Sequence, residues 1–240
     1  MEVDKAMIIF LLFFTIIALI VFLVRNKIHI KFNTFFKEGF KKIDNKFGVH
    51  CYCGKQGTGK TYSAVDFCNR FINDGFFVIT NVVSYSEYLG NDKCLYEPDI
   101  LKIMEMLETK NKINGKPVII FFDEIFTVIV KSKMPKEILA FLSQMRKRGL
   151  IFITTCQEWL ELNITFRRYV RYQINCNMWG LPIFKTAFLY NQVNDATKMK
   201  WDNLENEYIC PVIQTNFSKG LRSVINSYDT FETIDTNLIT

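Results

Sequence analysis

The first fifth of the chain contains two different hydrophobic patterns. From Ala6 to Val24 every residue except Thr15 is apolar. As an α-helix at 1.5 Å per residue this run is about 28 Å long, close to the roughly 30 Å hydrocarbon core of a bilayer. Acidic residues precede the run and no small-x-small cleavage site follows it, which argues against a removed signal peptide. We therefore expect residues 1–24 to form one uncleaved transmembrane anchor.

A second pattern occupies residues 25–46. Large apolar residues recur there at intervals of three and four, with lysines between them, as in a basic amphipathic helix on an anionic membrane surface. The same apolar face would equally suit packing on a globular domain. The apolar positions are Phe32, Phe35, Phe36, Phe40 and Ile43, and the lysines are Lys31, Lys37, Lys41, Lys42 and Lys46.

From Phe47 onward, short apolar runs alternate with helical stretches, which predicts an α/β domain over residues 47–240 with a mainly parallel central sheet. Gly180 and Pro182 separate two later runs that we expect to form a hairpin. We expect strands near 48–53, 76–80, 117–122 and 150–155, helices near 60–73, 99–110 and 135–148, and hairpin strands at 169–178 and 182–190.

Composition and charge narrow the class of protein. The 240 residues are 49% hydrophobic, which excludes a disordered chain. Of the net charge of +6, residues 25–46 carry +5, so the remainder is not basic enough for a general nucleic-acid coat. Basic residues directly after the anchor place that side in the cytoplasm, with the N-terminus outside.

The seven cysteines do not indicate a disulfide framework or a metal site. They contain no CxxC pair and fall mostly in apolar runs, where cysteine acts as a small hydrophobe. Cys51 and Cys53 lie two apart on an expected strand, without a further Cys or His at zinc spacing. We therefore expect buried, reduced cysteines that bind no metal.

The segment Gly54–Thr61 matches the phosphate-binding pattern GxxxxGK[ST] and lies between an expected strand and helix, as that pattern requires. Its backbone N–H groups would surround the phosphates of ATP. Lys60 would contact the β and γ phosphates, and the Thr61 hydroxyl would ligate Mg²⁺. The expected nucleotide-binding residues are Gly54, Lys55, Gln56, Gly57, Thr58, Gly59, Lys60 and Thr61.

Two further strand ends carry candidate catalytic residues. The apolar run 117–122 ends in Asp123 and Glu124, and ligands bind at the carboxyl ends of such buried strands. Asp123 would hold Mg²⁺, and Glu124 would polarise the attacking water. The run 150–155 is followed by Gln157, a candidate sensor of the γ phosphate with Thr155 as the reserve. Either residue would alternatively cap the next helix.

Arginines supply the remaining candidates. Arg146 and Arg148 flank the apolar face of the helix at 135–148, where one of them could act as an arginine finger on a neighbouring subunit's ATP. A charge cluster that complements the helix dipole is the alternative. Arg167, Arg168 and Arg171 form a second basic cluster, suited to an oligomer interface or to DNA phosphates.

The order of the motifs resembles the zonular occludens toxin-like ATPases, the filamentous-phage assembly proteins within the FtsK/HerA group of P-loop motors. The resemblance spans roughly residues 48–232, although here the membrane helix precedes the ATPase domain, whereas family members carry it afterwards. The matching segments are Gly54–Thr61, Ile79–Asn81, Ile120–Glu124, Gln144–Gly149, Ile153–Gln157 and Tyr228–Glu232.

This resemblance implies a membrane-anchored, homo-oligomeric ATPase in the host cell membrane that drives single-stranded phage DNA outward during virion extrusion, using ATP and Mg²⁺. Other phage assembly or coat proteins are the expected partners. Two alternatives stay open: an ATPase that packages DNA into a capsid, and a nucleotide-gated membrane scaffold without DNA transport.

Overall fold

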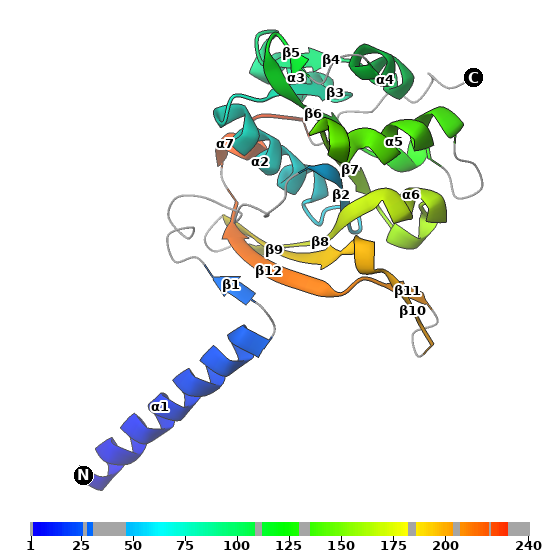
Figure 1. The fold of residues 1–240 in the computed structure, drawn as a ribbon. Coiled ribbons are helices and arrows are strands. Elements are labelled where there is room, and N and C mark those ends of the chain that lie inside the picture. Colours follow the sequence, from blue (N-terminus) through cyan, green and yellow to red (C-terminus); the bar gives the residue numbers. More distant parts are fainter. Residues whose placement is uncertain are drawn as a thin grey trace.

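A computed structural model describes residues 2–25, 28–30, 47–108, 112–129, 135–181, 186–203, 207–220 and 222–229. The chain begins with helix α1 (Glu2–Arg25), which projects away from the rest of the protein (Figure 1). Its described side chains are exposed except for the half-buried Leu23. In the part of the chain that the structure describes, no helix combines the length and apolarity needed to cross a membrane. The transmembrane anchor therefore stays a prediction.

The short strand β1 (Ile28–Ile30) follows and pairs in parallel with β12 (Val212–Lys219) at the edge of the main sheet. This strand lies inside the segment for which an amphipathic helix was expected. The apolar and lysine positions that carry that expectation, residues 31–46, lie outside the described residues.

The described residues form one large, ten-stranded sheet and one separate strand pair. In the main sheet, β8, β2, β7, β6, β3 and β4 lie side by side in this order and are parallel. Their bounds are β2 (Gly48–Cys53), β3 (Phe77–Thr80), β4 (Cys94–Tyr96), β6 (Lys116–Phe122), β7 (Ile151–Cys156) and β8 (Val170–Leu181).

Antiparallel strands extend the sheet beyond β8. Strand β9 (Thr186–Asp195) pairs with β8 as a hairpin and with β12 on its other side. The two-residue strand β5 (Lys112–Ile113) pairs with β6, and β10 (Lys200–Asp202) pairs with β11 (Glu207–Ile209) away from the main sheet. The expected hairpin is confirmed, but Gly180 pairs with Ala187 and Leu181 pairs with Thr186, so Gly180 lies within β8 and not in the turn.

Helices cover both faces of the parallel strands (Figure 1). One buried apolar cluster lies beneath α2 (Lys60–Asn73), α3 (Val83–Leu89) and α7 (Arg222–Ile225). The other lies beneath α4 (Ile100–Glu108), α5 (Lys136–Arg148) and α6 (Ile164–Tyr169). The central strands are buried on both faces, which is why their sequences are continuous apolar runs.

The predicted α/β class with a mainly parallel sheet is confirmed. Strands β2, β3, β6 and β7 and helices α2, α4 and α5 agree with the expected ranges to within two residues. In the hairpin, β8 ends three residues later than expected and β9 begins four residues later. Strand β7 lies between β2 and β6, so the ends of these three strands are neighbours. The sequence analysis did not identify α3, β4, β12 or the pair β10–β11. These elements are short or half-exposed, and their hydrophobic periodicity is correspondingly weak.

Candidate nucleotide-binding site

The loop Gly54–Gly59 joins the end of β2 to the first turn of α2, as the phosphate-binding motif requires. Gly59 precedes α2 with φ of 80°, a left-handed conformation that favours glycine. A Cβ on Gly54 would lie 2.6 Å from Thr58 Oγ1 and 2.8 Å from the Cys176 carbonyl oxygen. The loop therefore has no space for a larger residue at its first position.

Lys60 begins α2, and its ammonium lies over the loop, where Nζ donates to the Lys55 carbonyl oxygen at 3.1 Å. The unpaired backbone N–H groups of a helix N-terminus favour anions. A cation and a helix N-terminus thus meet at one loop, which is the arrangement that binds the phosphates of a nucleotide.

Asp123 lies at the end of β6 beside the first turn of α2. Its Oδ2 accepts a hydrogen bond of 3.1 Å from the Thr61 hydroxyl, and its Oδ1 accepts another from the Thr155 hydroxyl. Burial raises the pKa of the Asp123 carboxyl, and the hydrogen bonds from Thr155 and Thr61 oppose this shift. A buried carboxylate and a hydroxyl oxygen in contact are hard oxygen donors, so Thr61 and Asp123 fit Mg²⁺, which would supply charge neutralisation to the phosphates.

Asn81, just after β3, holds the backbone of Asp123 from the other side. Its Oδ1 accepts from the Asp123 N–H at 2.8 Å, and its Nδ2 donates to the Asp123 carbonyl oxygen at 3.1 Å. The Asn81 side chain is buried. Sequence reasoning noted Asn81 only through the family resemblance, because its effect depends on β3 lying next to β6.

Glu124 follows Asp123 in a left-handed conformation, with φ of 54° and ψ of 51°, which is uncommon for a residue other than glycine. The hydroxyl of Thr155 accepts a 2.9 Å hydrogen bond from the Glu124 N–H. Burial, and then the negative charge of Asp123, raise the pKa of the half-buried Glu124 carboxyl, whereas Lys60 opposes the shift. Unusual backbone conformations concentrate at active sites.

A cavity of about 500 Å³ lies between the phosphate loop and the ends of β6 and β7. Its polar part contains Lys60, Thr61, Asp123, Glu124 and Thr155 together with the loop residues Gln56, Gly57 and Gly59. Local sequence patterns do not indicate its apolar part. That part comes from α2, the residue before α3, the β8–β9 hairpin, α7 and the segment after it, through Tyr62, Val82, Met178, Leu189, Ile225 and Tyr228. An apolar wall next to a phosphate loop suits a nucleotide base.

The two candidate sensors of the γ phosphate, Thr155 and Gln157, differ in their position relative to the cavity. Thr155 is buried, lines the cavity and contacts both Asp123 and Glu124. Gln157 lies just beyond β7, is exposed, and is not among the described residues that line the cavity. As the chain is folded here, Thr155 is therefore the better placed of the two.

Of the two arginine candidates on α5, Arg148 is not among the described residues that line this cavity. Arg148 donates to the Leu107 carbonyl oxygen at 2.9 Å and to Gln144 Oε1 at 2.6 Å, which links α5 to the end of α4. Arg146 belongs to α5, but its side chain lies outside the described part of the structure. A role in trans for either arginine stays a prediction.

The second basic cluster is not a continuous surface feature. Arg167 is 6% exposed, and its guanidinium lies 5.9 Å from the ring centres of both Trp159 and Tyr208. The expectation that Arg167 faces a partner or DNA is therefore wrong for the chain as folded here, because the end of α6 packs inward. Arg168 is exposed and Arg171 half-buried.

The fold and the site together define a P-loop nucleoside triphosphatase with an extra strand between the phosphate-loop strand and the Asp123 strand. A family model for the ATPase family associated with various cellular activities (AAA) matches residues 50–178, more than half of the chain. The chain belongs to this family, and membership of the family confirms the predicted ATPase activity and ATP binding.

Comparison with solved structures gives similar chain traces at low identity. The genome-packaging NTPase B204 of Sulfolobus turreted icosahedral virus 2 is 13% identical, with 71% of this chain and 100% of that chain covered and a TM-score of 0.48. The N-terminal domain of zonular occludens toxin from Neisseria meningitidis is 16% identical, with 76% of this chain and 98% of that chain covered and a TM-score of 0.44. The flagellar accessory protein FlaH from Methanocaldococcus jannaschii is 18% identical, with 62% of this chain and 77% of that chain covered and a TM-score of 0.43. No curated protein is significantly similar in sequence.

Proposed function

We propose that this chain is a membrane-anchored ATPase motor that hydrolyses ATP with Mg²⁺ to move single-stranded viral DNA outward during virion extrusion. The observation that carries the enzymatic part is the contact of Thr61 and Thr155 with the two carboxylate oxygens of Asp123, with Glu124 next in the chain. Three separate elements thus meet at one carboxylate beside the phosphate loop.

The chemistry follows from these positions. Lys60 and the N–H groups of the loop bind and orient the phosphates, and Thr61 and Asp123 hold the Mg²⁺ that neutralises their charge. Glu124 accepts hydrogen bonds from the attacking water and aligns it with the γ phosphorus. Its raised pKa suits this role, because a carboxylate with a higher proton affinity is the stronger base.

The membrane part of the proposal rests on the N-terminal segment. Apolar side chains along the described part of α1 are exposed all around the helix, and a helix that is apolar on every side favours a lipid environment. The seven basic residues between 25 and 46 favour the cytoplasmic side of the host cell membrane. We propose a single-pass protein with its N-terminus outside and its ATPase domain in the cytoplasm.

Transport of DNA requires several subunits that act in turn, so we propose a homo-oligomer in which Arg146 or Arg148 reaches the ATP of a neighbour. Other phage assembly or coat proteins would receive the DNA. This part of the proposal is supported by the family resemblance of the motif order, from the phosphate loop to the segment that begins at Tyr228.

The test is ATP hydrolysis by the detergent-solubilised full-length protein, alone and with single- or double-stranded DNA. Stimulation by single strands supports extrusion. Stimulation by duplex DNA alone would replace this proposal with genome packaging. Hydrolysis that neither DNA changes would favour a nucleotide-gated membrane scaffold, and Glu124→Gln is the control for contaminating ATPases.

A further inference from the structure

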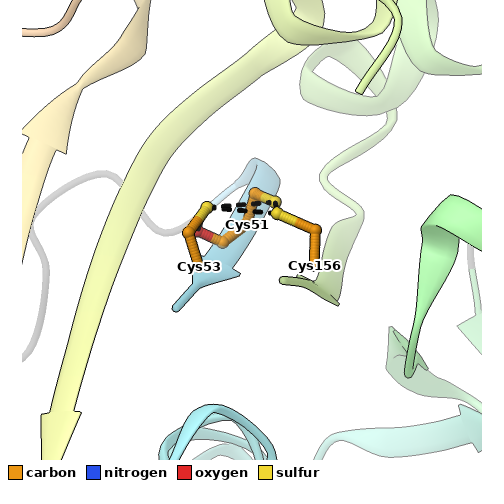
Figure 2. Close-up of side chains that lie close together, drawn as sticks. All are labelled: Cys51, Cys53 and Cys156. Carbon is orange, nitrogen blue, oxygen red and sulfur yellow. Dashed lines mark hydrogen bonds between the residues drawn. The ribbon is translucent and has the colours of Figure 1, made fainter. Parts of the chain in front are cut away.

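Three cysteines from two neighbouring strands meet in the core beneath the phosphate loop (Figure 2). Cys53 of β2 is the register partner of Cys156 of β7, and Cys51 lies two residues before Cys53 on the same face of β2. Local sequence patterns do not indicate a third ligand for Cys51 and Cys53, because Cys156 is 103 residues from Cys53 along the chain. Parallel pairing of β2 and β7 supplies the third sulfur.

The three sulfur atoms form a nearly equilateral triangle. The distances are 3.5 Å between Cys51 and Cys156, 3.7 Å between Cys51 and Cys53, and 3.3 Å between Cys53 and Cys156. The residues are 0%, 3% and 1% exposed in the order Cys51, Cys53, Cys156. Among the described residues, no fourth Cys, His, Asp or Glu joins this group.

The size of the triangle suits a metal ion. A point equidistant from the three sulfurs lies about 2.0 Å from each, and a metal–thiolate bond is about 2.3 Å long. An ion therefore fits either about 1 Å out of the sulfur plane or within it after each sulfur pair separates by roughly 0.5 Å. Either adjustment is within the reach of a rotation about the Cα–Cβ bonds.

The pKa values of the three thiols are shifted in different directions. Hydrogen bonds with Cys51 and Cys53, helped by the charge of Lys60, hold the pKa of the Cys156 thiol well below its ordinary value despite burial. Burial raises the pKa of the Cys51 and Cys53 thiols. A metal ion would take the place of their protons, as it does at other cysteine sites.

The number and type of ligands select the ion. Thiolates prefer soft ions, namely Cu(I), Zn²⁺ and the iron of iron–sulfur clusters. Structural zinc sites are closed by four ligands, and cubane or rhombic iron–sulfur clusters also use four cysteines. Cu(I) is soft and monovalent and is stable with three thiolates. We propose that Cys51, Cys53 and Cys156 form a three-coordinate binding site for Cu(I).

The position of the site connects it to the nucleotide site without depending on the proposed DNA transport. Cys53 precedes Gly54, whose N–H donates to the Cys156 carbonyl oxygen at 3.3 Å. Cys156 itself follows Thr155, which contacts Asp123. An ion bound to both strands would hold the start of the phosphate loop against the end of β7.

The test is anaerobic titration of reduced, detergent-solubilised full-length protein with Cu(I) in competition with a chromogenic Cu(I) chelator. We expect one ion per chain. Each of Cys51→Ala, Cys53→Ala and Cys156→Ala should weaken Cu(I) binding by at least ~100-fold, the upper range for loss of an outer-shell partner. The matched control is Cys68→Ala, because Cys68 is equally buried but lies on the other face of the sheet.

Thermal unfolding of the metal-free variants identifies any that fail to fold, and Cys51→Ala, the substitution farthest from the loop, then decides the question. X-ray absorption of the loaded protein should give three sulfur neighbours. Equal Cu(I) affinity in the wild type and Cys51→Ala would overturn the proposal. So would two or four sulfur neighbours, or tighter binding of Zn²⁺ than of Cu(I) at the same cysteines.

Discussion

Replacement of Asn81 by alanine tests whether the amide bridge to Asp123 positions the catalytic carboxylates. The substitution removes both hydrogen bonds between the Asn81 side chain and the Asp123 backbone, at 2.8 and 3.1 Å. It leaves the buried N–H and C=O of Asp123 without these partners. Each of the two unmet buried groups costs about 1–3 kcal/mol, so we expect a loss of about 2–6 kcal/mol in the free energy of unfolding. For a chain of this size that is a fall in Tm of roughly 4–24 °C.

The same substitution should affect catalysis more than nucleotide binding. Asn81 is not among the described residues that line the cavity, whereas Asp123 and Glu124 would both lose their fixed backbone. Since a displacement of about 1 Å can cost about 100-fold in rate, we expect kcat to fall by 10- to 100-fold with a much smaller change in ATP affinity. Urea denaturation measures the first effect, and steady-state hydrolysis with a nucleotide-binding assay measures the second.

The control is Asn177→Ala, because Asn177 is exposed on β8, and an exposed substitution should change stability by no more than about 0.5 kcal/mol. If Asn81→Ala loses less than about 1 kcal/mol in the free energy of unfolding and keeps an unchanged kcat, the Asn81 amide does not position Asp123. That result would mean that water replaces the amide and that β6 alone holds Asp123 in place.

Four further changes test the site. Lys60→Ala should abolish ATP binding, and wild-type affinity in a binding assay would contradict the phosphate-loop assignment. Glu124→Gln should still bind ATP but turn over at least ~100-fold more slowly. In the wild type, activity should be present above the raised pKa of Glu124 and fall as the pH decreases through it, so a pH–rate profile whose acid limb lies at the ordinary glutamate value would be inconsistent. Gly54→Ala should destabilise the loop through contacts of 2.6 and 2.8 Å, and an unchanged Tm would show that the loop can shift. Arg148→Ala mixed with Lys60→Ala should recover hydrolysis if Arg148 acts in trans. Lower stability without recovery would assign Arg148 to the link with Leu107.

Local sequence patterns were sufficient to predict the position of the phosphate loop and of the strands around it. GxxxxGK[ST] between a strand and a helix identifies the loop because the glycines, the cation and the hydroxyl act within eight consecutive residues. The apolar runs at 117–122 and 150–155 identify buried strands because both of their faces are covered. The prediction that Asp123 holds Mg²⁺ has the same basis, since a carboxylate directly after such a strand lies at the ligand-binding edge of the sheet.

The order of the strands and the packing of the helices determine which side chains enter the cavity and which are buried. Thr155 rather than Gln157 enters the cavity because β7 lies next to β6, which brings its hydroxyl to Asp123 and to the Glu124 N–H. Arg167 is buried because α6 packs against Trp159 and the segment that contains Tyr208, a contact that no local pattern encodes.

The apolar wall of the cavity and the cysteine triangle likewise depend on residues far apart in the sequence. Tyr228 reaches the nucleotide cavity from the C-terminal segment, and Cys156 reaches Cys51 and Cys53 through the pairing of β2 with β7. Local sequence is enough to predict which short segments carry candidate functional residues, because those residues act together with their neighbours in the chain. Which of these segments meet depends on the three-dimensional fold, because strand order and register are set by packing of the whole core.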